Sequence, residues 1–222
     1  MSEVNETVDI EKEEHVEVLE LTDEQLDALL NGADDIDPLD KVDRTLFDER
    51  IIYLTGEVNE QMVNNVVPMV HYYNALDDKY EIPIEDRSPL KVYVNTGGGE
   101  LYNGTAIQAA FEGSKTPIHT YAQGAVQMSM GLIIFLAGHK RFMSRHANFL
   151  YHELRSGMDV NTLAEMNNLV RHYSNLQDKM DKYIVERTKI PMKRLKNQRK
   201  KNLDWFIDFD TAKKYEMFDE TI

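Results

Sequence analysis

Three side chains that could together perform nucleophilic catalysis occur along this chain in the order Ser129, His152 and Asp204. A serine hydroxyl becomes a strong nucleophile when an imidazole accepts its proton, and a carboxylate can hold that imidazole in the required orientation. Ser129 comes directly before an apolar run, residues 130–137, that predicts a buried helix. His152 ends the strand-like residues 148–151, and Asp204 precedes a further apolar run. These positions predict acyl transfer, with Ser129 as nucleophile, His152 as base and Asp204 as the carboxylate that orients it.

Each of these residues also has a purely structural interpretation. Ser129 could be only a helix N-cap, because serine is favoured there, and His152 could be a buried histidine of a strand. The carboxylate could instead come from Asp178, Asp208 or Asp210. The catalytic interpretation is favoured because a glycine turn, the serine, the histidine and the aspartate all occur, in this order.

A run of glycines could supply the backbone N–H groups that stabilise an oxyanion. The apolar residues 92–94 are followed, after Asn95 and Thr96, by three consecutive glycines at positions 97–99. Such a run lets the backbone turn sharply. Met130 follows Ser129 at the expected helix start, where N–H groups lack helical partners. We expect the N–H groups of Met130 and of Gly99, or Gly98, to form an oxyanion hole. The run fits neither the dinucleotide nor the phosphate-loop spacing, so no cofactor is expected.

The elements that must position these residues alternate between strand and helix. Strand-like runs occur at residues 50–54, 92–94, 118–122 and 148–151, and helical patterns at 60–76, 104–111 and 130–137. Such alternation with right-handed crossovers predicts a parallel sheet in an α/β fold. Residues 161–187 predict a long late helix. Its expected apolar stripe consists of Leu163, Met166, Val170, Tyr173, Leu176, Met180 and Tyr183.

These motifs resemble the proteolytic subunit of the Clp protease, from about Arg44 to the C-terminus. Residues 50–54 are similar to the family's opening strand, and Asn95 to Gly99 to its Asn-Ser-Pro-Gly-Gly turn. The nucleophile motif corresponds to Ser129-Met130-Gly131, the base to Tyr151-His152, and the Asp-Arg-Phe segment to Asp204-Trp205-Phe206. Several separate motifs in the family's order make this resemblance specific.

The resemblance implies a ClpP/crotonase-like spiral of βαβ units with a layered sheet and a long late handle helix. It further implies a serine endopeptidase in a homo-oligomeric ring, a heptamer, fed with unfolded polypeptide by a separate ATP-driven AAA+ unfoldase. Two alternatives stay open. One is a catalytically inactive ClpP-like ring or scaffold subunit, and the other is a crotonase-type acyl-CoA enzyme, which also uses backbone N–H groups as an oxyanion hole.

Three departures from the family pattern bear on these expectations. Residues 124–129 are one residue longer than the family's segment before the nucleophile, which predicts a differently shaped elbow. Gly97 replaces a proline, which predicts a looser turn. Asn202 and Leu203 replace charged residues that couple two rings in the family, so a single ring and a double ring both stay open.

The acidic charge of the chain is concentrated at its start. Residues 1–43 hold 16 acidic and two basic residues, which account for the whole net charge of −14. We therefore expect residues 1–43 to be a mostly disordered extension and residues 44–222 to be the peptidase domain. Within the extension, Thr22 and Gln25 form a capping box that predicts a short helix near residues 22–31. Residues 187–201 hold eight basic residues and no acid, and the acidic extension could fold against them.

Several classes of function find no support in the composition. The chain has no cysteine, no run long enough to cross a membrane and no signal-peptide pattern, which together favour the cytoplasm. The basic residues 187–201 lack the interleaved aromatic residues of a nucleic-acid site, so none is expected. No metal site is expected either, because His139, His146 and His152 do not have metal-ligand spacing.

Overall fold

The computed structural model describes residues 37–124, 127–155, 157 and 162–222. The chain divides into two compact units, Met1–Arg44 and Thr45–Ile222. Of the first unit the structure describes only residues 37–44, where helix α2 (Pro38–Asp48) begins. The helix expected near residues 22–31 lies outside the described residues, and the domain boundary after residue 43 stays a prediction.

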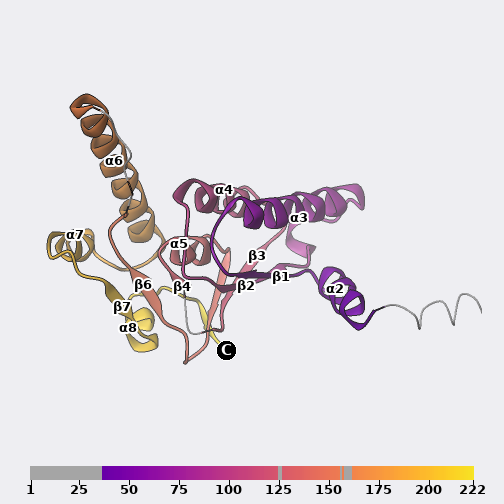
Figure 1. Cartoon of the computed structure of the whole chain (residues 1–222). Helices are drawn as coiled ribbons and strands as arrows, with labels where there is room; N and C mark the ends of the chain where they lie inside the picture. Colours follow the sequence, from indigo (N-terminus) through magenta and orange to yellow (C-terminus); the bar gives the residue numbers. More distant parts are fainter. Residues whose placement is uncertain (1–36, 125–126, 156, 158–161) are drawn as a thin grey trace, which may run out of the picture. The chain divides into compact units, whose positions relative to one another are not determined.

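Five parallel strands form the main sheet of the second unit, in the order β1-β2-β3-β5-β8 (Figure 1). They are β1 (Ile51–Thr55), β2 (Leu90–Asn95), β3 (Ile118–Ala122), β5 (Lys140–Met143) and β8 (Glu220–Thr221). Side chains alternate between the two faces of a strand, so Leu90, Val92 and Val94 of β2 all enter the core. On the opposite face four rings stack across β1, β2, β3 and β5 as an aromatic ladder of Tyr53, Tyr93, Tyr121 and Phe142.

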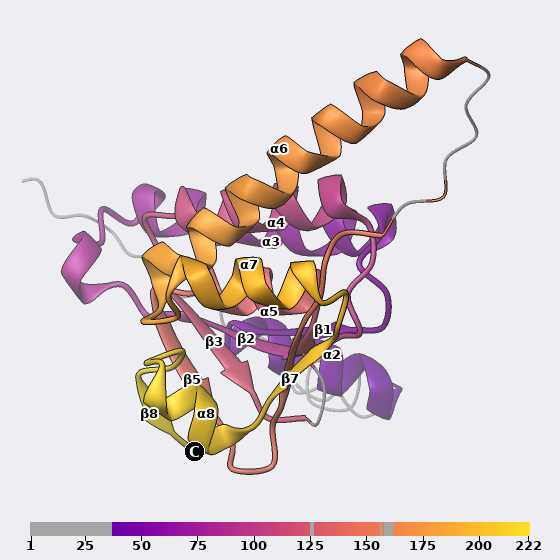
Figure 2. The same cartoon turned by 90° about the vertical axis from the view of Figure 1, so that its left-hand side faces the viewer.

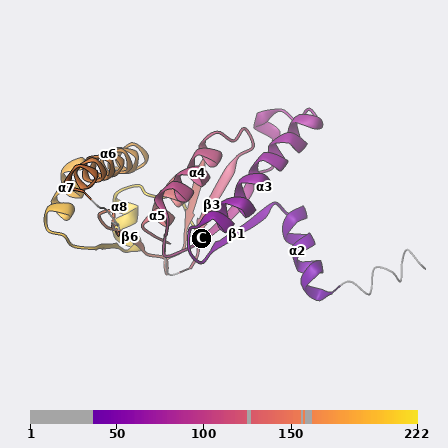
Figure 3. The same ribbon diagram turned by 45° about the horizontal axis from the view of Figure 1, so that its top comes forward.

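Three helices lie side by side over the buried face of this sheet (Figure 3). They are α3 (Glu60–Lys79), α4 (Leu101–Glu112) and α5 (Met130–Leu136), and a short 3₁₀ helix, η1 (Ile84–Asp86), follows α3. The side chain of Asn59 caps α3 by accepting from the N–H of Met62 at 3.0 Å. All seven residues of α5 are buried, which explains why its sequence is apolar on every side.

The residues of the predicted active site adjoin the strands of a second, smaller sheet. Its strands are β4 (Gln127–Met128), β6 (Phe149–Tyr151) and β7 (Trp205–Ile207), in the order β4-β6-β7. β4 runs parallel to β6, and β7 runs antiparallel to it. A single bridge between Thr96 and Gln127 connects β4 to the segment after β2, so the glycine turn and the small sheet adjoin.

The last helices are α6 (Leu163–Arg187), α7 (Met192–Lys200) and α8 (Phe209–Lys214). The amino-terminal part of α6 extends away from the neighbouring elements (Figure 2). Among the described residues, no helix combines the length and the apolar character needed to cross a membrane.

The predicted α/β fold with a parallel sheet and a long late helix is confirmed, and the apolar stripe predicted for α6 is half-buried only in its later turns, at Tyr173, Leu176, Met180 and Tyr183. The buried residues of this helix are Gln177, Asp181 and Ile184, whereas Leu163 and Val170 are exposed. The reason is that the first turns of α6 extend beyond the other elements, while its later turns face hydrogen-bonding groups of β6 and α7.

Candidate active site

The register of the small sheet brings the backbones of Ser129, His152 and Asp204 together. Met128 pairs with Leu150 across β4 and β6, and the next N–H, that of Ser129, donates to the carbonyl of Leu150 at 3.0 Å. Tyr151 pairs with Trp205 across β6 and β7. One further step of this antiparallel register sets His152 opposite Asp204. The three predicted residues therefore lie at the same end of the small sheet. Ser129 and His152 directly follow β4 and β6, and Asp204 directly precedes β7.

Ser129 occupies a sharp turn between β4 and α5. Its φ of 52° and ψ of −118° are unusual for a residue with a Cβ, and such backbone strain is concentrated at functional sites. The side chain of Ser129 is half-buried. A strained turn that joins a strand to a helix is the geometry that exposes the nucleophile of many hydrolases. Part of the lengthened elbow, residues 125–126, lies outside the described residues.

Gly98 lies directly against this turn. Its φ is +91°, and a Cβ added to Gly98 would lie 2.7 Å from the Cβ of Ser129 and 3.2 Å from the backbone nitrogen of Met130. No side chain could occupy this space without displacing the serine. The close approach explains why a glycine is needed at this position.

The backbone N–H groups expected to form the oxyanion hole differ in whether they have an acceptor. The N–H of Gly98 donates to the hydroxyl of Thr96 at 3.1 Å and is already used. The N–H groups of Gly99 and Met130 have no acceptor among the residues that the structure describes. Of the two glycines considered for the oxyanion hole, Gly99 therefore has the donor without an acceptor.

The imidazole of His152 has a defined hydrogen bond. Its Nδ1 lies 2.5 Å from the carbonyl oxygen of Glu153. A carbonyl only accepts, so Nδ1 carries the proton in the neutral ring and Nε2 has the free lone pair. His152 is half-buried in this arrangement, and its Nε2 is chemically suited to accept a proton from a hydroxyl.

Asp204 is bound to a residue that the sequence did not suggest. Its Oδ1 accepts a hydrogen bond of 2.6 Å from Nη2 of Arg155 in an exposed ion pair. Within the described part of the chain, no hydrogen bond joins His152 to Ser129 or to Asp204. The backbones of the three residues are adjacent, but their side chains are not linked.

Two of the three alternative carboxylates are engaged elsewhere, and the third belongs to another helix. Asp208 caps α8 by accepting from the N–H of Thr211, and hydrogen bonds from Thr211 lower the pKa of Asp208. Asp178 pairs with Arg199 at 3.0 Å, and Asp210 lies in the first turn of α8. These contacts leave Asp204 as the carboxylate that the register places beside His152.

The cavities near these residues are small. One of about 50 Å³ is lined by Glu153, Arg155 and Asp204 with residues of α7 and the following turn. Another, of about 260 Å³, lies between α6 and the segment after His152 and is lined by Leu154, Val170, Tyr173 and Arg199 among others. The described residues contain no group of three potential metal ligands.

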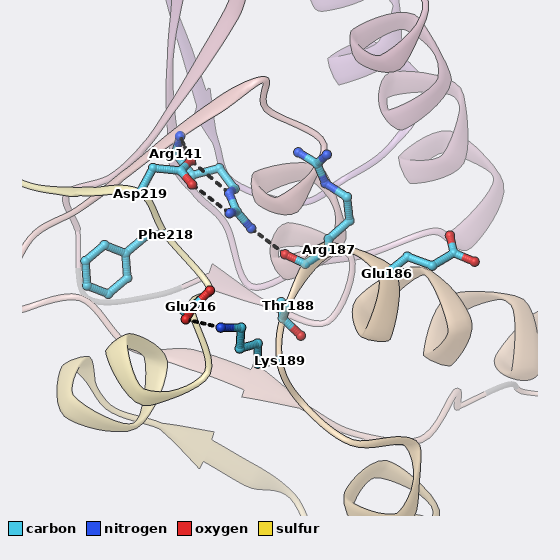
Figure 4. Close-up of a pocket in the computed structure, with 8 residues that line it drawn as sticks. All are labelled: Arg141, Glu186, Arg187, Thr188, Lys189, Glu216, Phe218 and Asp219. Atoms are coloured by element: carbon cyan, nitrogen blue, oxygen red, sulfur yellow. Dashed lines mark hydrogen bonds and ion pairs between the residues drawn. The ribbon is translucent and has the colours of Figure 1, made fainter.

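A larger cavity of about 500 Å³ lies at the carboxyl end of α6 and contains none of the predicted site residues (Figure 4). Its charged groups neutralise one another, with Arg141 bound to Asp219 and Lys189 to Glu216. Burial would raise the pKa of Asp219, but the guanidinium of Arg141 lowers it overall. We assign no chemistry to this cavity, because four of its ionisable groups are engaged in these pairs and Arg187 donates to the carbonyls of Leu136 and Gly138.

Comparison with known proteins connects this geometry to one family. The sequence model of the Clp protease family matches residues 37–222. The chain is 27% identical over 179 residues to the ATP-dependent Clp protease proteolytic subunit 2 of Bacillus licheniformis, covering 80% of this chain and 88% of that protein. It is also 27% identical over 179 residues to the ATP-dependent Clp protease proteolytic subunit of Deinococcus radiodurans, covering 80% of this chain and 82% of that protein.

The solved structures agree on the fold. A variant of ClpP1 from Listeria monocytogenes superimposes with a TM-score of 0.68 and 18% sequence identity, covering 82% of this chain and 95% of that one. This similarity confirms the expected ClpP-like fold. Together with the match over residues 37–222, it shows that the chain belongs to the Clp protease family.

Proposed function

We propose that this chain is a serine endopeptidase that hydrolyses peptide bonds of unfolded proteins through Ser129, His152 and Asp204. The observation that carries the proposal is the strained turn at Ser129, which lies against Gly98; the N–H groups of the adjoining residues Gly99 and Met130 have no acceptor in the described part of the chain. A hydroxyl on such a turn, next to unoccupied amide donors, fits the requirements of acyl transfer. Family membership independently supports proteolysis.

In the proposed mechanism, Nε2 of His152 accepts the proton of Ser129 Oγ as this oxygen attacks the substrate carbonyl. The N–H groups of Gly99 and Met130 stabilise the negative oxygen of the tetrahedral intermediate. His152 then gives the proton to the leaving amine, and water, deprotonated by the same imidazole, hydrolyses the acyl-enzyme. In this scheme the carboxylate of Asp204 leaves Arg155 and accepts from Nδ1 of His152 in place of the Glu153 carbonyl.

The proposal includes a ring of identical subunits, a heptamer by family resemblance. Exposed apolar side chains support a subunit contact on the projecting part of α6, where Leu163 is 79% exposed, Val170 52% and Met166 40%. Such apolar groups on a projecting helix are costly to leave in water and mark an interaction surface. The enclosed chamber would restrict cleavage to extended, unfolded chains.

We further propose that a separate ATP-driven AAA+ unfoldase delivers the substrate, because this sequence has no phosphate-binding loop of its own. The aromatic ladder offers a surface for such a partner. Tyr53 at its end is 55% exposed, and a cavity of about 340 Å³ opens between Tyr53, Tyr93 and Tyr121. The cytoplasm is the proposed compartment, since a chain without cysteine needs no oxidising environment.

A fluorogenic peptide assay on the assembled protein tests the proposed function. Ser129→Ala and His152→Ala should each abolish cleavage, because both groups take part in the transfer of the serine proton. Ser88→Ala and His71→Ala are matched controls on exposed positions away from the small sheet, and they should cleave like the wild type. Equal activity in all five proteins would overturn the proposal.

One observation favours a second candidate, a catalytically inactive ring or scaffold subunit. Asp204 is held by Arg155, and His152 by the Glu153 carbonyl, so neither side chain is linked to the other. If assembly does not rearrange these bonds, the triad does not form. A wild type that assembles into a ring but cleaves no peptide would establish this second function.

A further inference from the structure

Helix α6 buries a carboxylate that binds the residue immediately before the predicted base. The side chain of Asp181 is fully buried, and its Oδ1 accepts two hydrogen bonds. One comes from the hydroxyl of Tyr151 at 2.7 Å, and the other comes from Nε2 of Gln177 at 2.9 Å. Tyr151 is the residue immediately before His152, so the carboxylate fixes the chain on one side of the base.

The same helix fixes the chain on the other side of His152. Oε1 of Gln177 accepts a hydrogen bond of 2.7 Å from the backbone N–H of Leu154. Gln177 and Asp181 are one helical turn apart, so both anchors belong to one rigid element. Only His152 and Glu153 lie between the two anchored residues, and consecutive Cα atoms are about 3.8 Å apart. The short segment that carries both the imidazole and the Glu153 carbonyl bound to its Nδ1 is therefore held at both ends by α6.

Arg199 of α7 lies close to the Asp181 side chain. Nη2 of Arg199 lies 3.2 Å from Oδ2 of Asp181 and 3.0 Å from Oδ1 of Asp178. A buried carboxylate is costly unless an opposite charge lies close to it, and Arg199 is that charge for Asp181. Burial would lower the pKa of Arg199, but Asp181 and Asp178 raise it, so the guanidinium remains charged.

Tyr151 remains a hydrogen-bond donor in this environment. Burial raises the pKa of its hydroxyl, and the neighbouring carboxylate of Asp181 raises it further. Tyr151 is therefore neutral and donating over the whole range in which a peptidase works. The network joins three elements, β6, α6 and α7.

We propose that Asp181 is a positioning residue that, through Tyr151 and Gln177, holds the His152 imidazole in place for proton transfer from Ser129. This inference rests on the proposed peptidase function. Asp181 itself touches no reacting atom. Its loss should lower the rate of the chemical step and leave substrate binding unchanged, because a misplaced base slows proton transfer.

The test compares kcat, KM and Tm of the assembled protein across matched pairs of variants. Tyr151→Phe removes one buried hydroxyl of the network, and Tyr73→Phe removes a buried hydroxyl that donates to the carbonyl of Phe47. Both variants should lower Tm. Only Tyr151→Phe should lower kcat, by about tenfold, with KM within about twofold of wild type.

A conservative pair separates positioning from bulk stability. Asp181→Asn keeps the Oδ1 that accepts both hydrogen bonds, and should retain kcat within about threefold, whereas Asp181→Leu should lose more than about tenfold. Asp77→Asn is the control, since Asp77 is equally buried and pairs with Arg50 away from the small sheet. It should lower Tm and leave kcat unchanged.

Three outcomes would overturn the inference. Wild-type kcat in Tyr151→Phe, whether or not Asp181→Leu folds, would show that the network does not position His152. A loss confined to KM, or an equal loss of kcat in the Tyr73→Phe and Asp77→Asn controls, would show a general structural role. Cleavage that persists in Ser129→Ala would instead refute the proposed function, and the inference would fall with it.

Discussion

Arg155 Nη2 lies 2.6 Å from Asp204 Oδ1, so the carboxylate that the sequence assigns to the base is bound to a guanidinium three residues beyond that base. The strand register nevertheless sets the backbone of Asp204 opposite His152. One carboxylate thus has two possible partners on the same segment. The choice between them would decide whether the imidazole is oriented for catalysis.

Replacing Arg155 should leave the Asp204 carboxylate free to bind His152. An exposed ion pair contributes about 0.2–1 kcal/mol, so Arg155→Leu should raise kcat by up to about fivefold at low salt. Wild-type activity should rise with ionic strength as the pair is screened, and the variant should show no such rise. Lys189→Leu, which breaks the remote exposed pair with Glu216, is the control. A loss of activity in Arg155→Leu would show that the guanidinium supports Asp204.

Gly98→Ala should abolish peptidase activity, because the new Cβ would lie 2.7 Å from that of Ser129. We expect kcat to fall by more than about 100-fold in the fluorogenic assay. Two glycines serve as controls. Gly97→Ala meets no atom within 4 Å, and Gly56→Ala shares a positive φ of +87° but also meets none. Both should keep kcat, and only Gly56→Ala should lower Tm. Normal activity in Gly98→Ala would contradict the close approach.

The buried pair of Arg50 and Asp77 should make stability depend on pH. Hydrogen bonding to Arg50 lowers the pKa of Asp77 below its unfolded value of about 3.9. The stabilisation is therefore complete above that unfolded value and is lost as the pH falls through the lower folded value. Asp77→Asn should cost about 3 kcal/mol in urea unfolding at pH 6, with a smaller cost at pH 3. A cost that grows toward low pH would contradict this assignment.

Charges on the projecting part of α6 should prevent assembly. The double variant Leu163→Glu and Val170→Glu places carboxylates on two exposed apolar positions and should shift the sedimentation coefficient to that of smaller species. Asn167→Glu adds one charge to an exposed polar position of the same helix and should assemble normally. Unchanged sedimentation of the double variant would show that this surface is not a subunit contact.

Local patterns were sufficient to predict the alternating strands and helices and the position of Ser129. The strand before Gly98, the buried helix after Ser129 and the strand before His152 each carry a signal within a few residues. Their adjacency follows from the crossover rule for parallel strands. The choice of Gly99 over Gly98 as donor did not follow, because it depends on a hydrogen bond from Gly98 to Thr96.

The side-chain contacts between residues far apart in the chain could not be predicted from the sequence. Arg155 lies in an irregular segment, and nothing in its neighbourhood indicates a bond to Asp204. Gln177 follows Tyr173 by one helical turn and Asp181 follows Gln177 by another, so both lie on the apolar face of the long helix, but a polar side chain carries no sequence signal of burial. Their burial is explained by partners contributed by β6 and α7, such as Tyr151 and Arg199, which become neighbours only in the folded chain.

Labelling with a fluorophosphonate followed by intact-mass and peptide mass spectrometry tests the central claim most directly, since this reagent reacts with activated serines. We predict one adduct per subunit, located on Ser129, absent in Ser129→Ala and much slower to form in His152→Ala. An assembled wild type that forms no adduct, or one whose adduct persists in Ser129→Ala, would contradict it.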